Sequence, residues 1–303
     1  MMEKTESDNE FERYYKLLIS MSYRMMGSFM EAEDIVQEVA IEWHKTDISR
    51  IKNKKAWLIR VCTNKSIDSL RKAYRKRELY PGTWLPEILP NSLITWDDEV
   101  EKKESLNTSF LILLENLNPK ERAIYVLRAV FEYDFKKIAE FTTLNVSNCR
   151  KIFERANIKI INKNNIYDDN NKMSLNILKN FFDSAKLGSE DKIKELLSEN
   201  SEFWSDGGGK VSAAKDVIKD IQKISRFFSN IFKSLENDEH LYKYEYLLVN
   251  HLPGLILSRK DSVGLWRIET IFNFEFINNK VYRMYAQRNP DKLKMIEKNL
   301  FQK

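Results

Sequence analysis

Half of the prolines in this chain lie within one short stretch. The sequence has six prolines in 303 residues, and three of them are Pro81, Pro86 and Pro90. A proline inside a helix has no amide donor and clashes with the preceding turn, so this stretch cannot be regular helix. With the acidic residues that follow, it predicts a linker over residues 79–104. A second polar break, residues 162–172, separates the middle of the chain from its C-terminal part.

Charge alternates in blocks along the first half of the chain. Residues 1–49 carry 5 Lys and Arg against 11 Asp and Glu, and residues 50–78 carry 11 against 2. Residues 79–115 carry 2 against 7, and residues 116–165 carry 10 against 5. Basic blocks favour contact with a polyanion such as nucleic acid, although ordinary solvated helix faces give the same pattern.

Several protein classes are excluded by other features. The longest apolar runs, such as Phe110 to Leu114, fall far short of the roughly 18 residues of a membrane span. The acidic N-terminus lacks the profile of a signal peptide. The two cysteines, Cys62 and Cys149, are far apart without a CxxC motif, and the chain has only three histidines. We therefore expect a cytoplasmic protein with no membrane partner, no disulfide framework, no metal site and no cofactor.

The segment before the linker is helical by its periodicity. Apolar side chains recur at three- and four-residue steps over residues 11–25, and Gly27 interrupts the run. Ser28 and Glu31 form a capping-box signature for the next helix. That helix is expected to bury Ile35, Val39 and Trp43. A long basic helix follows over residues 53–77, about 37 Å long if it is unbroken.

The middle segment has the proportions of a helix-turn-helix. Asn118 to Glu121 supplies an N-cap, a proline at the first helical position and a glutamate at the third. Two further helices are expected at residues 134–141 and 147–157, with Cys149 facing inward as a buried thiol. A three-helix bundle with no role in DNA binding fits the same pattern, because the turn at residues 142–145 lacks the usual glycine.

The C-terminal part has mixed periodicity. Helices are expected at 174–187, 190–198 and about 214–235. Apolar and polar residues then alternate over residues 268–276, which is a strand pattern. Asn278 and Asn279 tolerate a positive φ and predict a hairpin turn before a strand at residues 280–287. This order of elements indicates an α+β domain with a curved antiparallel sheet.

Short motifs in these segments resemble one known family. Region 2 of the sigma-70 family is similar to Ala32–Glu38, Ala56–Val61 and Asn64–Arg71, and region 4 is similar to Asn118–Arg122 and Asn148–Phe153. The large region 3 is missing between them, as in the extracytoplasmic-function (ECF) group. The ECF subgroup with a SnoaL-like C-terminal domain is similar at Trp84–Glu87, Asp206–Lys210 and Asn289–Leu293.

The resemblance implies an architecture and a function. It implies a multidomain protein with two all-α sigma domains, region 2 at residues 8–78 and region 4 at residues 105–163. An α+β SnoaL-like cone follows at residues 174–303. The implied function is that of a sigma factor, which directs the RNA polymerase core to promoter DNA and initiates transcription. The C-terminal domain would modulate this activity in cis.

The family's binding roles carry over to matching positions in residues 8–78. Core polymerase would be bound by Asp34, Gln37 and Glu38. The −10 promoter element would be bound by Arg60, Asn64, Lys65, Arg71, Arg75, Lys76 and Arg77. Asn64 would capture an unstacked base, because an amide can hydrogen bond a base edge while nearby cations neutralise phosphates. For Trp57, helical spacing with Val61 favours a core position over stacking on a base. Asp68 is expected to be a surface ion-pair partner.

The second helix of the helix-turn-helix would enter the major groove at the −35 element. Its candidate contacts are Ser147, Asn148, Arg150, Lys151 and Arg155. Arg150 is the expected base reader, because a guanidinium can bridge two acceptors on guanine. Lys151 and Arg155 are expected to hold phosphates.

The remaining motifs would form a regulatory interface with the sigma domains. Its residues are Trp84, Leu85, Pro86, Glu87, Asp206, Gly207, Gly208, Gly209, Lys210, Asn289, Pro290, Asp291, Lys292 and Leu293. A plain strand-to-helix turn at the three glycines stays open as the alternative. Asp206 and His251 are the only acid–base pair to consider, and nothing places them together, so no catalysis is expected. An unidentified small-molecule ligand stays open. The alternative function is a ligand-binding or catalytic cone that carries a DNA-targeting helical arm.

Overall fold

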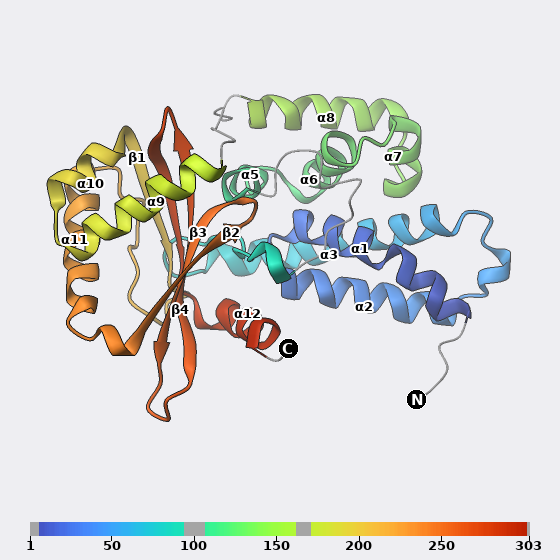
Figure 1. Ribbon diagram of the computed structural model, residues 1–303. Helices are drawn as coiled ribbons and strands as arrows, with labels where there is room; N and C mark the ends of the chain where they lie inside the picture. Colours follow the sequence, from blue (N-terminus) through green and yellow to red (C-terminus); the bar gives the residue numbers. More distant parts are fainter. Residues whose placement is uncertain (1–5, 94–106, 162–170, 302–303) are drawn as a thin grey trace. The chain divides into compact units, whose positions relative to one another are not determined.

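The computed structural model describes residues 6–93, 107–161 and 171–301, and the chain divides into two compact units (Figure 1). The first unit comprises residues 1–79 and 95–164, and the second comprises residues 80–94 and 165–303. Residues 80–94 were expected to belong to a linker between the sigma domains. In the structure the described part, residues 80–93, packs as part of the C-terminal unit.

The first unit is helical throughout its described residues. Its elements are α1 (Glu6–Met26), α2 (Phe29–Lys45), η1 (Ile48–Arg50), α3 (Lys54–Glu78), α5 (Thr108–Leu114), α6 (Pro119–Tyr125), the π-helical turn η3 (Val126–Val130), α7 (Phe135–Thr142) and α8 (Val146–Ile161). The expected break after α1 is present, because Gly27 has a φ of +68° and Ser28 Oγ accepts a hydrogen bond from the Glu31 amide at 3.3 Å. As predicted, α2 buries Ile35, Val39 and Trp43.

The predicted helix-turn-helix corresponds to α7 and α8. Asn118 and Glu121 form a complete capping box at the start of α6. The turn after α7 places Thr143 at a φ of +55°, a conformation usually taken by glycine, so the chain turns tightly without one. Cys149 is fully buried and lies 3.7 Å from Thr142 Oγ1. The structure therefore explains how the unusual turn sequence is accommodated.

The second unit is an α+β domain. Its elements are η2 (Asn91–Leu93), α9 (Asn171–Lys186), α10 (Glu190–Leu196), β1 (Leu197–Asp206), α11 (Ile221–Glu236), η4 (Glu239–Leu241), β2 (Tyr242–Val249), β3 (Leu252–Lys260), β4 (Trp266–Ile277), β5 (Lys280–Gln287) and α12 (Pro290–Phe301). The sheet has the order β1-β5-β4-β3-β2. All neighbouring strands are antiparallel except β1 and β5, which are parallel, so the expected antiparallel sheet is mixed at one edge.

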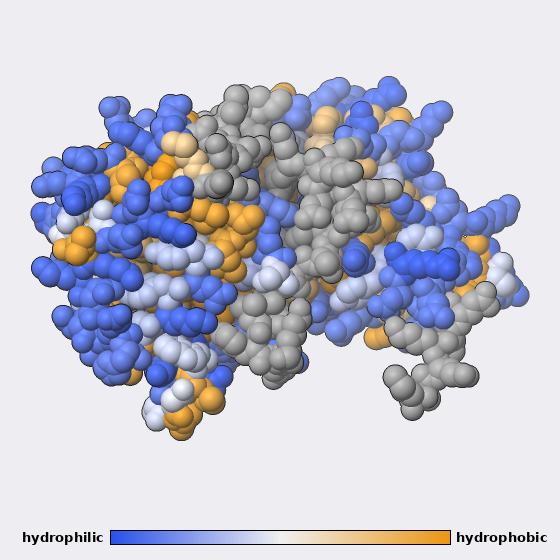
Figure 2. Space-filling model, in the orientation of Figure 1, coloured by the Kyte–Doolittle hydropathy of each residue, from blue (hydrophilic) through white to orange (hydrophobic). Residues whose placement is uncertain are grey.

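Phenylalanines fill the space between the helices and one face of this sheet. The rings of α9, α11 and β4 that meet there are Phe181, Phe182, Phe228, Phe232, Phe272 and Phe274. The hairpin turn between β4 and β5 was correctly predicted, since Asn278 and Asn279 have φ angles of +50° and +59°. Figure 2 shows hydrophilic residues over most of the outer surface of α10 and α11, as expected for helices that bury their apolar sides.

Two helix boundaries in this unit differ from the prediction. The helix expected from about residue 214 begins at Ile221, because Asp220 caps it by accepting hydrogen bonds from the amides of Gln222 and Lys223. The preceding Ile218 instead pairs with Phe203 as a short β-bridge. The helix expected to reach residue 198 ends at Leu196, where β1 begins. No described helix is both long enough and apolar enough to cross a membrane.

Candidate nucleic-acid interface and linker clamp

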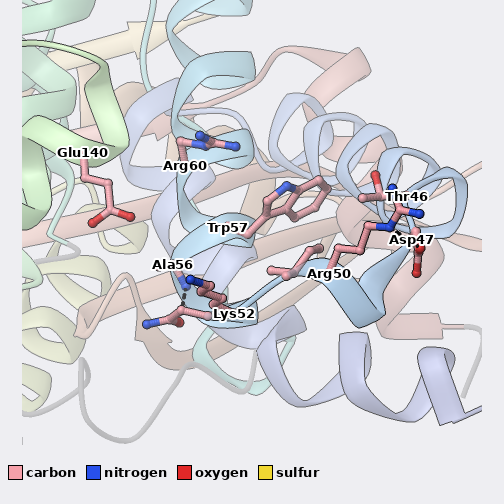
Figure 3. A pocket seen from close by; sticks show the side chains of 10 residues that line it. Thr46, Asp47, Arg50, Lys52, Ala56, Trp57, Arg60 and Glu140 are labelled. Carbon is pink, nitrogen blue, oxygen red and sulfur yellow. Dashed lines mark hydrogen bonds and ion pairs between the residues drawn. The ribbon is translucent and has the colours of Figure 1, made fainter.

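An open pocket of about 560 Å³ lies in the first unit, where the loop after α2 meets α3 and α7 (Figure 3). Trp57 forms its aromatic wall, half-buried, with its ring 5.7 Å from that of Trp43. The expectation that Trp57 lies in the core is therefore wrong in part, since the ring is also accessible. The lining residues are Thr46, Asp47, Arg50, Ile51, Lys52, Asn53, Ala56, Trp57, Arg60 and Glu140.

The pocket combines an aromatic face with exposed cations. Arg50, Lys52 and Arg60 are all exposed around Trp57. A base can stack on an indole ring, and cations at the rim can neutralise the adjoining phosphates. Asn53 holds the start of α3 by accepting a hydrogen bond from the Ala56 amide at 2.9 Å. The arrangement therefore suits an unstacked nucleotide chemically.

Asn64 lies one helical turn beyond Arg60 on α3 and is not among the residues lining the pocket. Its side-chain amide donates to the carbonyl of Arg60 at 2.9 Å and to the carbonyl of Phe141, in α7, at 3.2 Å. Both donor positions of the side-chain nitrogen are thus occupied. In this conformation the amide is satisfied within the protein.

The other predicted −10 contacts divide into exposed and engaged side chains. Exposed on α3 are Arg60, Arg71, Arg75 and Lys76, and Arg71 pairs with Asp68 at 2.7 Å as expected for a surface ion pair. Lys65 pairs with Glu38 at 3.4 Å and Glu42 at 3.2 Å. Partial burial lowers the pKa of Lys65, but these two carboxylates outweigh it, so the pKa is raised and the ammonium stays charged.

Arg77 differs from the other predicted DNA contacts in being engaged within the protein. Its side chain is only 12% exposed and pairs with Glu115 at 2.6 Å and with Glu31 at 3.5 Å. It also donates to the Met26 carbonyl at 2.5 Å. In this conformation Arg77 joins α3 to α2, to the end of α1 and to Glu115 within the first unit. The basic run at the end of α3 gave no sign of this, because its partners lie far away in sequence.

The predicted −35 contacts lie on α8 and are all exposed. These side chains are Ser147, Asn148, Arg150, Lys151 and Arg155. The Arg150 guanidinium lies 5.8 Å from the centre of the Phe135 ring, which orients it near the start of the helix. The predicted polymerase contacts Asp34, Gln37 and Glu38 are likewise exposed along one side of α2. The positions of both sets permit contact with a large partner.

A second site lies within the C-terminal unit, where the residues of the predicted regulatory interface meet residues 80–91. Asp206 is fully buried at the end of β1. One carboxylate oxygen accepts from Tyr80 Oη at 2.5 Å and from the Gly208 amide at 3.0 Å. The other accepts from the Leu85 amide at 3.1 Å and from Lys292 Nζ at 2.7 Å. We call this group of five residues the linker clamp.

Two side chains near the start of α12 make further contacts with the attached segment, Lys292 of the linker clamp and the neighbouring Asn289. Lys292 Nζ also donates to the Leu85 carbonyl and lies 4.5 Å from the centre of the Trp84 ring. Asn289 donates to Tyr80 Oη at 2.8 Å. Burial, followed by the hydrogen bond to Asp206, raises the pKa of the Tyr80 phenol, so it remains a donor at neutral pH.

The three glycines allow this approach. Gly208 and Gly209 have φ angles of +63° and +67°, which disfavour any residue with a Cβ. A Cβ on Gly209 would overlap Pro81, and a Cβ on Gly208 would overlap the Asn289 side chain. The turn is therefore a surface against which residues 80–91 fit closely. Beside it, Lys210 and Asp291 form an exposed ion pair at 2.5 Å.

The same segment is attached a second time further along. Leu89 donates its amide to Asn250 Oδ1 at 3.0 Å, and the Asn250 amide donates to the Leu89 carbonyl at 2.9 Å. Asn91 accepts from the His251 amide at 3.0 Å, and Pro90 bridges Val249. His251 therefore holds the linker segment, whereas Asp206 contacts Tyr80 and Lys292, so the two do not form an acid–base pair.

The remaining predicted interface residues are mostly buried. Leu85, Pro86 and Glu87 are buried in the linker segment, and Leu293 is buried in α12. Pro290 begins α12 at a position where its missing amide donor costs nothing. Among residues 6–93, 107–161 and 171–301, no group of three His, Cys, Asp or Glu side chains is placed to hold a metal ion.

Two groups of site residues were missed by the sequence analysis. The first is the loop at residues 46–53 that completes the pocket, although Arg50 and Lys52 open the basic block and were a usable signal. The second is the pair Asn250 and His251, which hydrogen bond to residues 89–91. The backbone of these two residues has positive φ angles of +46° and +63°. Nothing local marks those two residues as partners of residues 89–91.

Comparison with known proteins finds relatives that are all sigma factors of RNA polymerase. The family pattern described as Sigma-70 region 2 matches residues 11–76. The ECF RNA polymerase sigma factor SigJ of Mycobacterium tuberculosis is 30% identical over 222 residues, 72% of this chain and 71% of the relative. The ECF RNA polymerase sigma factor SigW of Bacillus subtilis is 29% identical over 154 residues, 47% of this chain and 80% of the relative.

A solved structure extends the similarity over nearly the whole chain. The crystal structure of the M. tuberculosis extracytoplasmic function sigma factor SigJ superposes with a TM-score of 0.72. It is 24% identical and covers 94% of this chain and 98% of its own. The likeness concerns the fold, including helical sigma regions followed by an α+β domain.

Proposed function

Because this chain belongs to the ECF sigma factors of the sigma-70 family, which bind the RNA polymerase core and promoter DNA, we propose that α2, α3 and α8 divide this work between them. On this proposal α2 binds the core enzyme, α3 reads the −10 element and α8 reads the −35 element. The observation that carries it is the cation-rimmed aromatic pocket at α3 in the same unit as the exposed basic face of α8.

The pocket supports the −10 assignment. Melting a promoter exposes bases that no longer stack in the duplex, and a half-buried indole offers one of them a replacement surface. Arg50, Lys52 and Arg60 then contact the backbone of the same strand. Asn64, one turn further along α3 and outside the pocket, supplies an amide for a base edge when its bonds to the Arg60 and Phe141 carbonyls are released. An asparagine can both donate to and accept from a base, which a lysine cannot.

The acidic side of α2 supports the polymerase assignment and gives the first experiment. We expect the wild-type protein to co-elute with RNA polymerase core in size-exclusion chromatography, and Asp34→Arg to weaken that association about tenfold by charge reversal. Asp216→Arg, a matched change at an exposed carboxylate of the C-terminal unit, serves as the control. Equal co-elution of all three proteins would contradict the assignment of α2.

We propose further that the C-terminal domain regulates the sigma domains in cis through the linker clamp. The covalent chain from Leu79 to Asn107 has 29 residues and could reach about 100 Å when extended. With residues 80–91 attached to the C-terminal domain, residues 92–107 cover at most about 55 Å. Promoter elements one and a half helical turns apart are separated by about 50 Å. The clamp therefore shortens the free part of the connection from about 100 Å to about 55 Å, and the rest of the path between α3 and α5 is fixed on the C-terminal domain.

The linker clamp predicts how this regulation is released. Lys292→Met removes the cation that joins Asp206, Leu85 and Trp84, and leaves the buried carboxylate without its ion pair. By hydrogen-exchange mass spectrometry we expect the amides of Leu85 and Leu89 to exchange about tenfold faster in this variant, because the attached segment opens. The amides of β4 should keep their protection, which shows that the domain remains folded.

Promoter output is the functional readout of the same variant. Transcription by holoenzyme containing Lys292→Met should differ from wild type, whereas Lys243→Met, which breaks only the exposed ion pair with Glu245 on β2, should leave it unchanged. Linker amides that exchange rapidly in the wild type, or identical transcription by both variants, would refute cis regulation through the clamp.

The alternative of a ligand-binding or catalytic cone receives less support. Six phenylalanine rings occupy the face of the sheet that the helices cover, where such a domain would hold its ligand. Asp206 and His251, the acid–base pair considered from the sequence, are both used to hold the linker. We therefore propose that the C-terminal domain binds the linker segment of its own chain, residues 80–91, and has no catalytic role.

A further inference from the structure

Gln287 is a fully buried side chain whose hydrogen-bonding groups are unsatisfied. It lies at the end of β5 and is 0% exposed. Neither its Nε2 nor its Oε1 has a hydrogen-bond partner within the part of the chain that the structure describes. A buried amide normally pairs both groups, because an unpaired one loses the hydrogen bonds that water supplied. The C-terminal unit therefore carries a destabilising group at a defined position.

The register of the sheet places Gln287 beside Asp206, the carboxylate of the linker clamp. Gln287 pairs with Asp206 where β1 and β5 run in parallel, and the Arg288 amide donates to the Asp206 carbonyl at 2.8 Å. Side chains of paired residues lie on the same face of a sheet. The preceding residue, Ala286, belongs to the phenylalanine core on the other face. The side chains of Gln287 and Asp206 thus share the face to which the linker segment, residues 80–91, is attached.

The linker segment crosses the strand that carries Gln287. It is attached to the end of β1 through Asp206, and to the end of β2 through Val249 and Asn250. The sheet order β1-β5-β4-β3-β2 places β5 between these two attachments. Release of the segment would therefore uncover the end of β5.

Asp206 has no acceptor position left for Gln287 while the segment is attached. Its two oxygens accept two hydrogen bonds each, and Tyr80 and Leu85 of the linker segment supply one bond to each oxygen. A carboxylate oxygen offers about two acceptor positions. Release of the segment would vacate one position on each oxygen, next to Gln287 in the sheet.

From this arrangement we infer that Gln287 competes with the linker segment for Asp206. While the segment is attached, the Gln287 amide is buried without a partner. After release, its Nε2 donates to a position that Tyr80 or Leu85 has left, and water reaches its remaining polar groups. Gln287 therefore favours the released state and offsets part of the stabilisation that the linker clamp provides.

The inference rests on the proposed linker clamp, and hydrogen-exchange mass spectrometry of the full-length protein tests it. Gln287→Met keeps the length of the side chain and removes both polar groups. The amides of Leu85 and Leu89 should exchange about tenfold more slowly in this variant than in wild type, because the attached state no longer buries an unpaired amide. Gln222→Met, the same change at an exposed position in the first turn of α11, is the matched control and should exchange like wild type.

A second background tests the competition itself. Tyr80→Phe removes one donor from Asp206 and vacates an acceptor position while the other attachments remain. In that background Gln287 already has an acceptor, so adding Gln287→Met should slow exchange by no more than about twofold. A gain of about tenfold in both backgrounds would show that Gln287 acts independently of Asp206 and would overturn the inference.

Failure of this inference can be distinguished from failure of the linker clamp. Unchanged or faster exchange in Gln287→Met, with Lys292→Met still exchanging faster than wild type, would overturn the competition and leave the clamp standing. If Lys292→Met also exchanged like wild type, both would fall. Gln287→Leu, an apolar variant of different shape, should repeat the result of Gln287→Met. Loss of protection at the β4 amides in both variants would contradict the inference, because removal of an unpaired amide should not unfold the domain.

Discussion

Asp206 illustrates how a single buried charge organises a distant segment of chain. A fully buried carboxylate costs several kcal/mol unless its oxygens are satisfied. Here both oxygens accept two hydrogen bonds each, two of the four from residues 80–85. If the linker segment dissociated, Asp206 would keep only its hydrogen bonds from Gly208 and Lys292. Attachment of the linker therefore satisfies half of the hydrogen bonds of this buried carboxylate.

Two substitutions on different helices should separate the two steps of promoter use. Asn64→Ala removes the amide offered to an unstacked base, and we expect it to weaken promoter melting by about 1 kcal/mol. The measurement is the permanganate reactivity of the −10 element.

Arg150→Ala should leave melting intact and weaken binding to the −35 element by about 1–3 kcal/mol, measured by gel shift with holoenzyme. Both variants should co-elute with core polymerase normally. Equal behaviour of wild type and both variants at limiting holoenzyme would refute these assignments.

At the scale of elements, the turn between α7 and α8 stores strain that a substitution can relieve. Thr143 is β-branched, exposed and held at a φ of +55°, where a Cβ costs about 1 kcal/mol. Thr143→Gly should therefore raise the free energy of unfolding by about 0.5–1 kcal/mol, measured by chemical denaturation. Thr46→Gly, at an extended φ of −94° after α2, should be neutral or destabilising. A loss of stability in Thr143→Gly would contradict the strain argument.

Helices and strands with a strong period could be predicted from the sequence. The helix now defined as α3 was expected one residue earlier at each end, and the strand now defined as β4 was recognised from alternation over residues 268–276. The start of α11 was misplaced because Ile218 finds a long-range partner in Phe203, a contact no local pattern contains. The parallel pairing of β1 with β5 was missed for the same reason.

The candidate sites could be predicted where their residues lie close together in the sequence. The exposed basic face of α8 followed from helical spacing alone. The attachment of residues 80–91 to Asp206 did not, because it joins residues more than 120 positions apart. The pairing of Arg77 with Glu31 in α2 and with Glu115 after α5 was not predicted, because both carboxylates are far from Arg77 in sequence. The charged residues of the sites were thus recognised from the sequence, whereas their ion-pair partners are known only from the folded structure.

At the scale of the whole molecule, the proposed control acts on the connection between the two DNA-reading regions. A sigma factor must present two DNA-reading helices about 50 Å apart, and the linker clamp shortens the free chain that joins them. The attached segment is held by hydrogen bonds to Asp206 and Asn250 and by the burial of Leu85, Ile88 and Leu89. The binding energy that core polymerase supplies can shift this attachment only as far as the two states differ in their affinity for it.

The central claim is that this chain selects promoters for RNA polymerase, and mapping of transcript start sites tests it most directly. Core polymerase would be incubated with fragmented genomic DNA from the source organism, with and without the full-length protein, and the 5′ ends of the transcripts sequenced. The account predicts discrete start sites that appear only with the protein, that share sequence elements near −10 and −35, and that weaken with Asn64→Ala and Arg150→Ala. A folded protein that adds no start sites to those of core alone would contradict it and favour the alternative of a C-terminal binding domain with a DNA-targeting arm.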